Sequence, residues 1–234
     1  LIVPPLSWPG AWVALAMAAL LGNAVMARGT RSLAAPPAAA PARGEGFRAR
    51  DFAFGLLGYL MFGLGYIGYM TFIVTLLREQ GVGGAVIVAF YVLLGAGVIA
   101  SSWLWAPLLQ RYRGGQPLAV LDALLAVATL LPVASAHPVA VFASGALFGA
   151  VFLSVVASTT VLVRHNLPPA AWPAGIAAFP IVFAGGQIVG PVLVGWVADG
   201  PGGLVRGLAL SAGVLALGAL LASRQRALPN APAH

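Results

Sequence analysis

Three tyrosines in one apolar stretch have the types and spacing to bind a small molecule. Tyr59, Tyr66 and Tyr69 are separated by seven and three residues, so a helix places them on a shared face, with Thr71 close by. A tyrosine ring stacks on apolar groups, while its hydroxyl needs a hydrogen-bond partner. In the middle of an apolar helix, such a face meets either a partner helix or a cavity, and the residues alone leave both interpretations open.

Gln187 is the polar side chain that is most difficult to place in an apolar run. Its amide has four hydrogen-bonding sites, and hydrocarbon satisfies none of them. It is therefore the strongest candidate for contacting a solute or bridging two helices. Ser154 and Ser158, four residues apart, either contribute to the same site or donate to carbonyls of their own helix.

Asp122 is the one acid embedded in an apolar run. An acid in that environment acts either as a proton carrier or as the partner of a cation. Its position near the start of the run favours pairing with an arginine at the same end of the helices. The candidates for this ion pair, or gate, are Arg111, Arg113 and Arg164.

Common sequence patterns of enzyme active sites are absent. The chain has no G-x-S-x-G, no H-E-x-x-H and no G-x-x-x-x-G-K-[ST] pattern. Three histidines and five acids are spread along a chain without cysteine, so a metal site is not expected. We expect neither an enzyme nor a cofactor.

The composition identifies the solvent that surrounds these residues. Of 234 residues, 61% are hydrophobic and 7% are charged, whereas soluble domains have about 45–50% apolar and about 25% charged residues. The surface must therefore face lipid, and the lipid bilayer is the first expected partner. The fold class that follows is an all-α, polytopic integral membrane protein.

Seven apolar runs are long enough to cross a bilayer, which takes about 20 residues. These predicted spans are Gly10–Ala27, Phe52–Leu77, Gly84–Leu109, Pro117–Ala136, Pro138–Val163, Trp172–Ala198 and Leu204–Ser223. The expected organisation is a single helix in residues 1–28, an Ala/Pro/Arg linker in 29–50, a six-helix domain in 51–226 and a tail in 227–234.

The basic residues indicate the orientation. All 12 are arginines, and 10 of them fall in alternate connections, which places them on one side of the membrane. By the positive-inside rule that side is cytoplasmic, so the N-terminus lies outside and the C-terminus inside. This asymmetry accounts for the net charge of +7 without nucleic acid as a partner. An odd number of spans and a start without methionine indicate a piece of a longer protein.

Glycine is unusually frequent, with 30 residues that fall largely inside the spans. Small residues allow helix backbones to approach closely in lipid. Two GxxxG patterns stand out, Gly145 with Gly149 and Gly186 with Gly190. Tight packing explains them; the alternative is a helix that bends or slides during a transport cycle.

Several segments resemble helices of the major facilitator superfamily, and most closely its YbfB/YjiJ-type branch. The run 186–199, with Gly186-Gln187-Ile188-Val189-Gly190-Pro191, resembles helix eleven, and 58–69 resembles helix seven. The stretch 108–113 resembles a cytoplasmic loop signature in which Gln110 here replaces the usual acid. The similarity covers essentially the whole chain, which would comprise helices six to twelve of twelve.

This resemblance implies a secondary active transporter of a small organic solute that works by alternating access in the bacterial inner membrane. Its site would lie on helices seven, eight, ten and eleven. Those helices carry Tyr59, Tyr66, Tyr69, Thr71, Tyr91, Ser154, Ser158, Phe183 and Gln187. These side chains are aromatic or neutral, which suits an amphiphilic or neutral solute. The missing N-terminal half would complete the pathway and carry any proton coupling.

The alternative is a non-transporting membrane module, a truncated half that only packs against a partner. Five further spans upstream in the same reading frame favour the transporter, whereas a genuine start near Leu1 favours the module.

Overall fold

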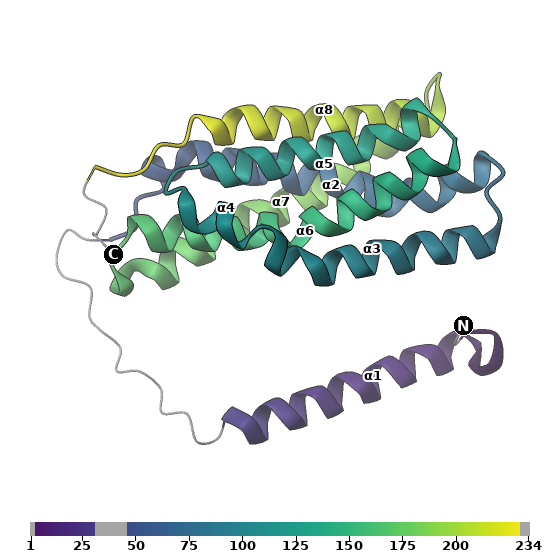
Figure 1. Ribbon diagram of the computed structural model, residues 1–234, viewed down its shortest axis with the longest axis horizontal. Coiled ribbons are helices and arrows are strands. Elements are labelled where there is room, and N and C mark those ends of the chain that lie inside the picture. The colour runs from purple at the N-terminus through teal and green to yellow at the C-terminus, as the bar shows by residue number, and fades with distance from the viewer. Residues whose placement is uncertain (1–2, 31–45, 230–234) are drawn as a thin grey trace. The chain divides into compact units, whose positions relative to one another are not determined.

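The computed structural model describes residues 3–30 and 46–229, and the regular structure in those ranges is helical (Figure 1). Seven of the described helices are long and apolar enough to cross a membrane, which confirms the predicted all-α, polytopic class. The elements are α1 (Val3–Thr30), η1 (Ala49–Phe52), α2 (Ala53–Glu79), α3 (Gly84–Leu104), α4 (Ala106–Arg111), α5 (Gln116–Ala134), α6 (Pro138–Asn166), η2 (Pro169–Ala171), α7 (Trp172–Ala198) and α8 (Gly203–Ser223).

The chain divides into two compact units, Leu1–Ala39 and Ala40–His234. The first contains α1, a 28-residue helix with Pro9 inside it. The second contains the other helices. Most of the predicted linker, including residues 31–45, lies outside the described residues, as do positions 230–234 of the predicted tail.

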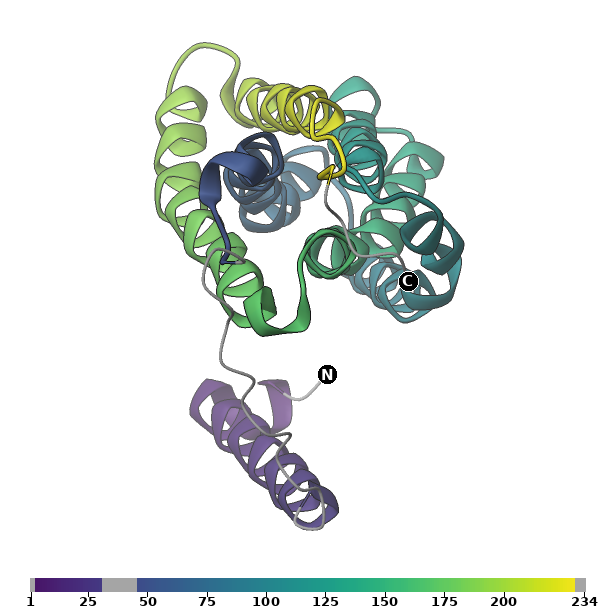
Figure 2. The same ribbon diagram turned by 90° about the vertical axis from the view of Figure 1, so that its left-hand side faces the viewer.

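Within the second unit, α2 packs mainly between α7 and α8. It contacts α7, α8 and α5, while α6 packs on α3 and α5 (Figure 2). The helices α3 and α7 keep more of their surface outward, and that surface is apolar. Trp103 on α3 is 74% exposed and Trp196 on α7 is 76% exposed. Such outward apolar surface is what a protein dissolved in lipid requires.

The two GxxxG patterns lie where helix backbones meet. A Cβ on Gly186 would lie 2.7 Å from the Leu60 carbonyl oxygen of α2, and one on Gly149 would overlap the Leu94 carbonyl of α3. The glycines therefore allow α7 to pack directly on α2 and α6 directly on α3.

The third predicted span, Gly84–Leu109, lies within one candidate membrane span, Gly84–Arg111, which is formed by two helices and not by a single continuous one. The α-helix α3 ends at Leu104, and α4 begins at Ala106 after Trp105. Pro107 lies in the first turn of α4, where its missing N–H is tolerated, whereas inside a continuous helix it would leave a carbonyl without a donor. The Trp105 indole nitrogen donates to the Ala150 carbonyl at 2.7 Å and so attaches the break to α6.

Candidate functional site

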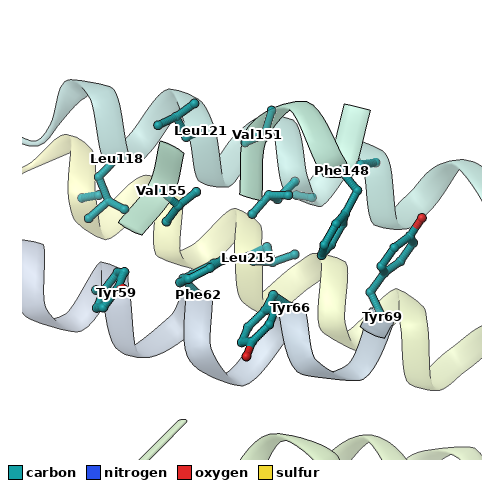
Figure 3. Packing of buried hydrophobic residues seen from close by; sticks show 14 of the residues in the cluster. Tyr59, Phe62, Tyr66, Tyr69, Leu118, Leu121, Phe148, Val151, Val155 and Leu215 are labelled. Carbon is teal, nitrogen blue, oxygen red and sulfur yellow. The ribbon is translucent and has the colours of Figure 1, made fainter. Parts of the chain in front are cut away.

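Aromatic rings line α2 from its first third to its middle, and α7 contributes a ring that stacks on them. Phe183 of α7 lies 5.2 Å from Tyr59, 5.4 Å from Phe62 and 5.4 Å from Tyr66, measured between ring centroids. Interplanar angles of 17–28° make these contacts stacked. Figure 3 shows the α2 members of this group in succession along the helix.

The helix α6 closes the group from another side. Phe152 stacks on Tyr66 at 5.3 Å and lies 6.1 Å from Phe62, and Phe148 follows at 5.9 Å from Phe152. Three helices thus present rings to one another, and offset aromatic pairs contribute about 0.5–1.5 kcal/mol each beyond the area they bury. We call Tyr59, Phe62, Tyr66, Phe152 and Phe183 the aromatic cluster.

A polar contact between α7 and α2 lies at the aromatic cluster. The Gln187 side-chain nitrogen donates a hydrogen bond to the Tyr66 hydroxyl and so joins α7 to α2. Gln187 is half-buried. Its backbone carbonyl also lacks the usual helical donor, because the residue four positions later is Pro191. The fold therefore brings together two of the predicted site residues that lie 121 positions apart in the sequence. Gln187 keeps further hydrogen-bonding groups there that these contacts do not use.

Tyr69 lies elsewhere, although it shares α2 with Tyr66. The two hydroxyls point in opposite directions (Figure 3). The Tyr69 hydroxyl is 2.6 Å from the Ser144 hydroxyl of α6, which donates to the Ala128 carbonyl of α5 at 2.7 Å. That carbonyl lacks its helical donor because Pro132 lies four residues later. Since Ser144 has one hydrogen, Tyr69 is the donor between them, and this fully buried chain ties three helices together.

The remaining predicted solute contacts are scattered. Thr71 on α2 and Tyr91 on α3 are exposed. Ser154 donates across to the Ser101 carbonyl of α3 at 3.2 Å, and Ser158 donates to the Val155 carbonyl of its own helix at 2.7 Å. Neither serine joins Gln187. Ser158 donates within its own helix, which was the other interpretation of this spacing, whereas Ser154 donates to a carbonyl of the neighbouring helix α3.

Comparison with known proteins now decides the family. Residues 3–223 match the family described as the uncharacterised MFS-type transporter YbfB. The chain belongs to this family of MFS-type transporters. The match confirms the resemblance drawn from the sequence and makes the protein a multi-pass membrane transporter. No curated protein and no solved structure gave a match.

Asp122 of this YbfB-type chain is placed differently from the expectation. It is fully buried on α5, and within the described residues neither carboxylate oxygen has a hydrogen-bond partner. No hydrogen bond therefore joins Asp122 to Arg111, Arg113 or Arg164, and the ion pair expected from the sequence stays a prediction. The physical reason is the direction of the side chain: Oδ2 lies 3.1 Å from the position of a Cβ on Gly218, against α8 inside the bundle.

Two of the three arginines contact rings instead. The Arg164 guanidinium lies 4.7 Å from the Trp172 ring centroid, and that of Arg111 lies 5.7 Å from the Tyr112 ring centroid. The cation–π contact of Arg164 connects the end of α6 to the start of α7. The Arg113 carbonyl accepts a hydrogen bond from the Asn166 side chain at 2.7 Å.

Two side-chain amides that were not identified from the sequence connect helix ends of the YbfB-type bundle with one another. The Gln225 side chain accepts from the Gly55 N–H of α2 and donates to the Asp51 carbonyl, both at 3.0 Å. Asn166 accepts from the Leu228 N–H at 2.6 Å. Each amide follows an apolar run within a few residues, where orphan helix-end groups need partners. That position is the signal by which they could have been found.

Proposed function

We propose that this MFS-type transporter carries a small organic solute by alternating access, and that the solute binds between α2 and α7 beside Tyr66 and Gln187. The observation that carries this proposal is the hydrogen bond between these two side chains within stacked rings. Polar side chains in the spans of transport proteins mark substrate pathways, and sites formed near proline-interrupted helices are common in secondary transporters.

The free hydrogen-bonding capacity of Gln187 gives this pair its role. One amide hydrogen is used toward Tyr66, which leaves the second hydrogen and the carbonyl oxygen of the side chain for a solute. The backbone carbonyl opposite Pro191 adds an acceptor. When the solute binds, the Gln187 amide and the Tyr66 hydroxyl can each form a hydrogen bond to it. The solute then replaces the hydrogen bond that joins α7 to α2 in its absence.

The surrounding side chains favour a neutral or amphiphilic solute. The aromatic cluster surrounds the pair with uncharged rings that stack on one another, and such an environment suits apolar or planar groups. Phosphates and dicarboxylates are bound through charge-assisted hydrogen bonds, usually from arginine. The described arginines lie at the helix ends or between helices, away from the middle of α2 and α7.

The proposal includes a second half of the transporter. Alternating access requires two helix bundles that rock around a shared site. We assign α1 as the sixth of twelve helices, the Ala40–His234 unit as the second bundle, and an N-terminal half of the same transporter as its partner. The arginine asymmetry supports a cytoplasmic C-terminus in a bacterial inner membrane.

The test is an uptake screen with the complete transporter in proteoliposomes, run with and without a pH gradient because proton coupling belongs to the hypothesis. The panel contrasts neutral amphiphilic compounds with phosphates and dicarboxylates. We expect uptake of the first group, and Gln187→Leu to reduce it at unchanged membrane insertion. Unchanged uptake in Gln187→Leu removes this residue from the site. A folded protein that transports nothing supports the non-transporting module instead.

A further inference from the structure

Three arginines from distant parts of the chain surround one hollow at an end of the bundle. The hollow has a volume of about 570 Å³, and Arg50, Arg224 and Arg226 are among its lining residues. It lies where α2 begins and α8 ends, which is the same end of the bundle (Figure 1). Among the described lining residues Asp51 is the only acid, and its Oδ1 lies 3.6 Å from the Arg50 Nε. With three arginines and one acid, these described residues carry a net charge of +2.

The walls of this hollow are held in place by Gln225. This residue is 4% exposed, and its side-chain amide joins the segment after α8 to Gly55 in the first turn of α2 and to Asp51 in η1. The backbone carbonyl of Gln225 also accepts a hydrogen bond from the Gly115 N–H at 2.8 Å, which ties the start of α5 to the same segment. Hydrogen bonds therefore hold the backbone that carries the arginines, and the chain loses less conformational entropy when a ligand binds.

One side of the hollow is apolar and continues along the helix. Phe54 lines the hollow and is 45% exposed, and Leu57, one turn further along α2, is 43% exposed. A phosphate ion has no group to place on this surface, and it is much smaller than the hollow. An anionic phospholipid has both parts, because its phosphate pairs with guanidinium groups and its acyl chain lies on apolar side chains.

We propose that the hollow formed by Arg50, Arg224, Arg226 and Phe54 binds the headgroup phosphate of an anionic phospholipid. Basic pockets at the ends of membrane helices bind such headgroups, and each arginine near an anionic surface contributes about fivefold in affinity. The site lies at the end of the bundle, whereas the proposed solute site lies around Gln187. The two proposals are independent.

The test measures lipid retention by the purified protein with native mass spectrometry, with phosphatidylglycerol and phosphatidylethanolamine as the probes. We expect phosphatidylglycerol to be retained in preference, and the double variant Arg224→Gln/Arg226→Gln to retain it about twenty-five-fold less. The matched control is Arg48→Gln/Arg111→Gln, which removes the same charge from exposed positions outside the hollow. The control should retain the lipid within about twofold of the parent protein.

A second variant and a competitor separate lipid from free anion. Phe54→Ala should weaken retention of phosphatidylglycerol, and inorganic phosphate at equal concentration should not displace the lipid. The proposal is overturned if the control variant loses as much lipid as the hollow variant, if both lipids are retained equally, or if inorganic phosphate displaces the lipid. A thermal unfolding midpoint equal to that of the parent protein checks that each variant is folded.

Discussion

The side-chain amide of Gln187 on α7 donates to the hydroxyl of Tyr66 on α2, and Phe183, one turn earlier on α7, stacks on the same tyrosine at 5.4 Å. A single ring of α2 is thus held by a hydrogen bond at its edge and by an aromatic face. Both contacts come from one helix, so a displacement of α7 relative to α2 changes them together. This makes the pair a suitable place for a solute to act on the packing of the two helices.

Removal of the Tyr66 hydroxyl should reduce transport without unfolding the protein. Tyr66→Phe keeps the stacked ring but leaves the Gln187 amide without its partner, and an unpaired buried polar group costs about 1–3 kcal/mol. We expect initial uptake to fall about tenfold in proteoliposomes at equal protein content. Tyr69→Phe is the matched control because it makes the same change on the same helix, away from Gln187. Equal losses in both variants would contradict this assignment.

Ser144 should matter for stability rather than transport. Ser144→Ala removes the donor to the Ala128 carbonyl, which Pro132 already deprives of its helical donor, and also removes the acceptor for Tyr69. We expect the free energy of unfolding to fall by about 1–3 kcal/mol. Ser158→Ala should change it little, since that hydroxyl bonds a carbonyl of its own helix.

A double-mutant cycle checks the chain of hydrogen bonds. If Tyr69 donates to Ser144, the effects of Tyr69→Phe and Ser144→Ala on unfolding in detergent will be less than additive. Additive effects would show that the two hydroxyls are energetically independent.

The spans could be predicted from the sequence because each is an apolar run of bilayer length bounded by turn residues. The predicted Trp172–Ala198 coincides with α7, and Pro138–Val163 differs from α6 by three residues at one end. The break at Trp105 was missed because the run remains apolar across it. Hydropathy reports the solvent around a segment, and it does not distinguish Pro107, which lies in the first turn of a new helix, from Pro132 and Pro191, which lie inside continuous helices.

The site could be predicted only residue by residue. Gln187 and Tyr66 were each identified because an isolated polar group in hydrocarbon needs a partner, but nothing in the sequence pairs positions 121 apart. Helical spacing grouped Tyr69 with Tyr66. Three residues turn the helix by about 300°, so the two side chains leave it about 60° apart, and their rings then turn away from each other toward different helices. For a similar reason, the side chain of Asp122 faces a different neighbour from the one expected. Its position in the apolar run indicates its depth in the membrane, but not which neighbouring helix it faces.

The close contact of α7 with α2 predicts different outcomes at two adjacent glycines. A Cβ on Gly186 would lie 2.7 Å from the Leu60 carbonyl oxygen and 2.8 Å from the Leu64 nitrogen, whereas one on Gly185 would meet no atom within 4 Å. Gly186→Ala should therefore lower the free energy of unfolding by about 1–3 kcal/mol through overpacking. Gly185→Ala should be neutral or stabilising by up to about 1 kcal/mol. Thermal unfolding in detergent measures both, and equal effects would contradict the backbone contact.

Asp122 provides a test of the interior of the bundle. Its carboxyl group is fully buried and has no hydrogen-bond partner among the described side chains and backbone, so its removal breaks no bond. We expect Asp122→Asn, which keeps the shape beside Gly218, to leave the thermal unfolding midpoint unchanged or raise it. Loss of one partner from a buried ion pair costs about 3–5 kcal/mol, so a drop of that size would reveal a cation paired with Asp122. Asp51→Asn is the control, because its contact with Arg50 is exposed and such pairs contribute about 0–1 kcal/mol.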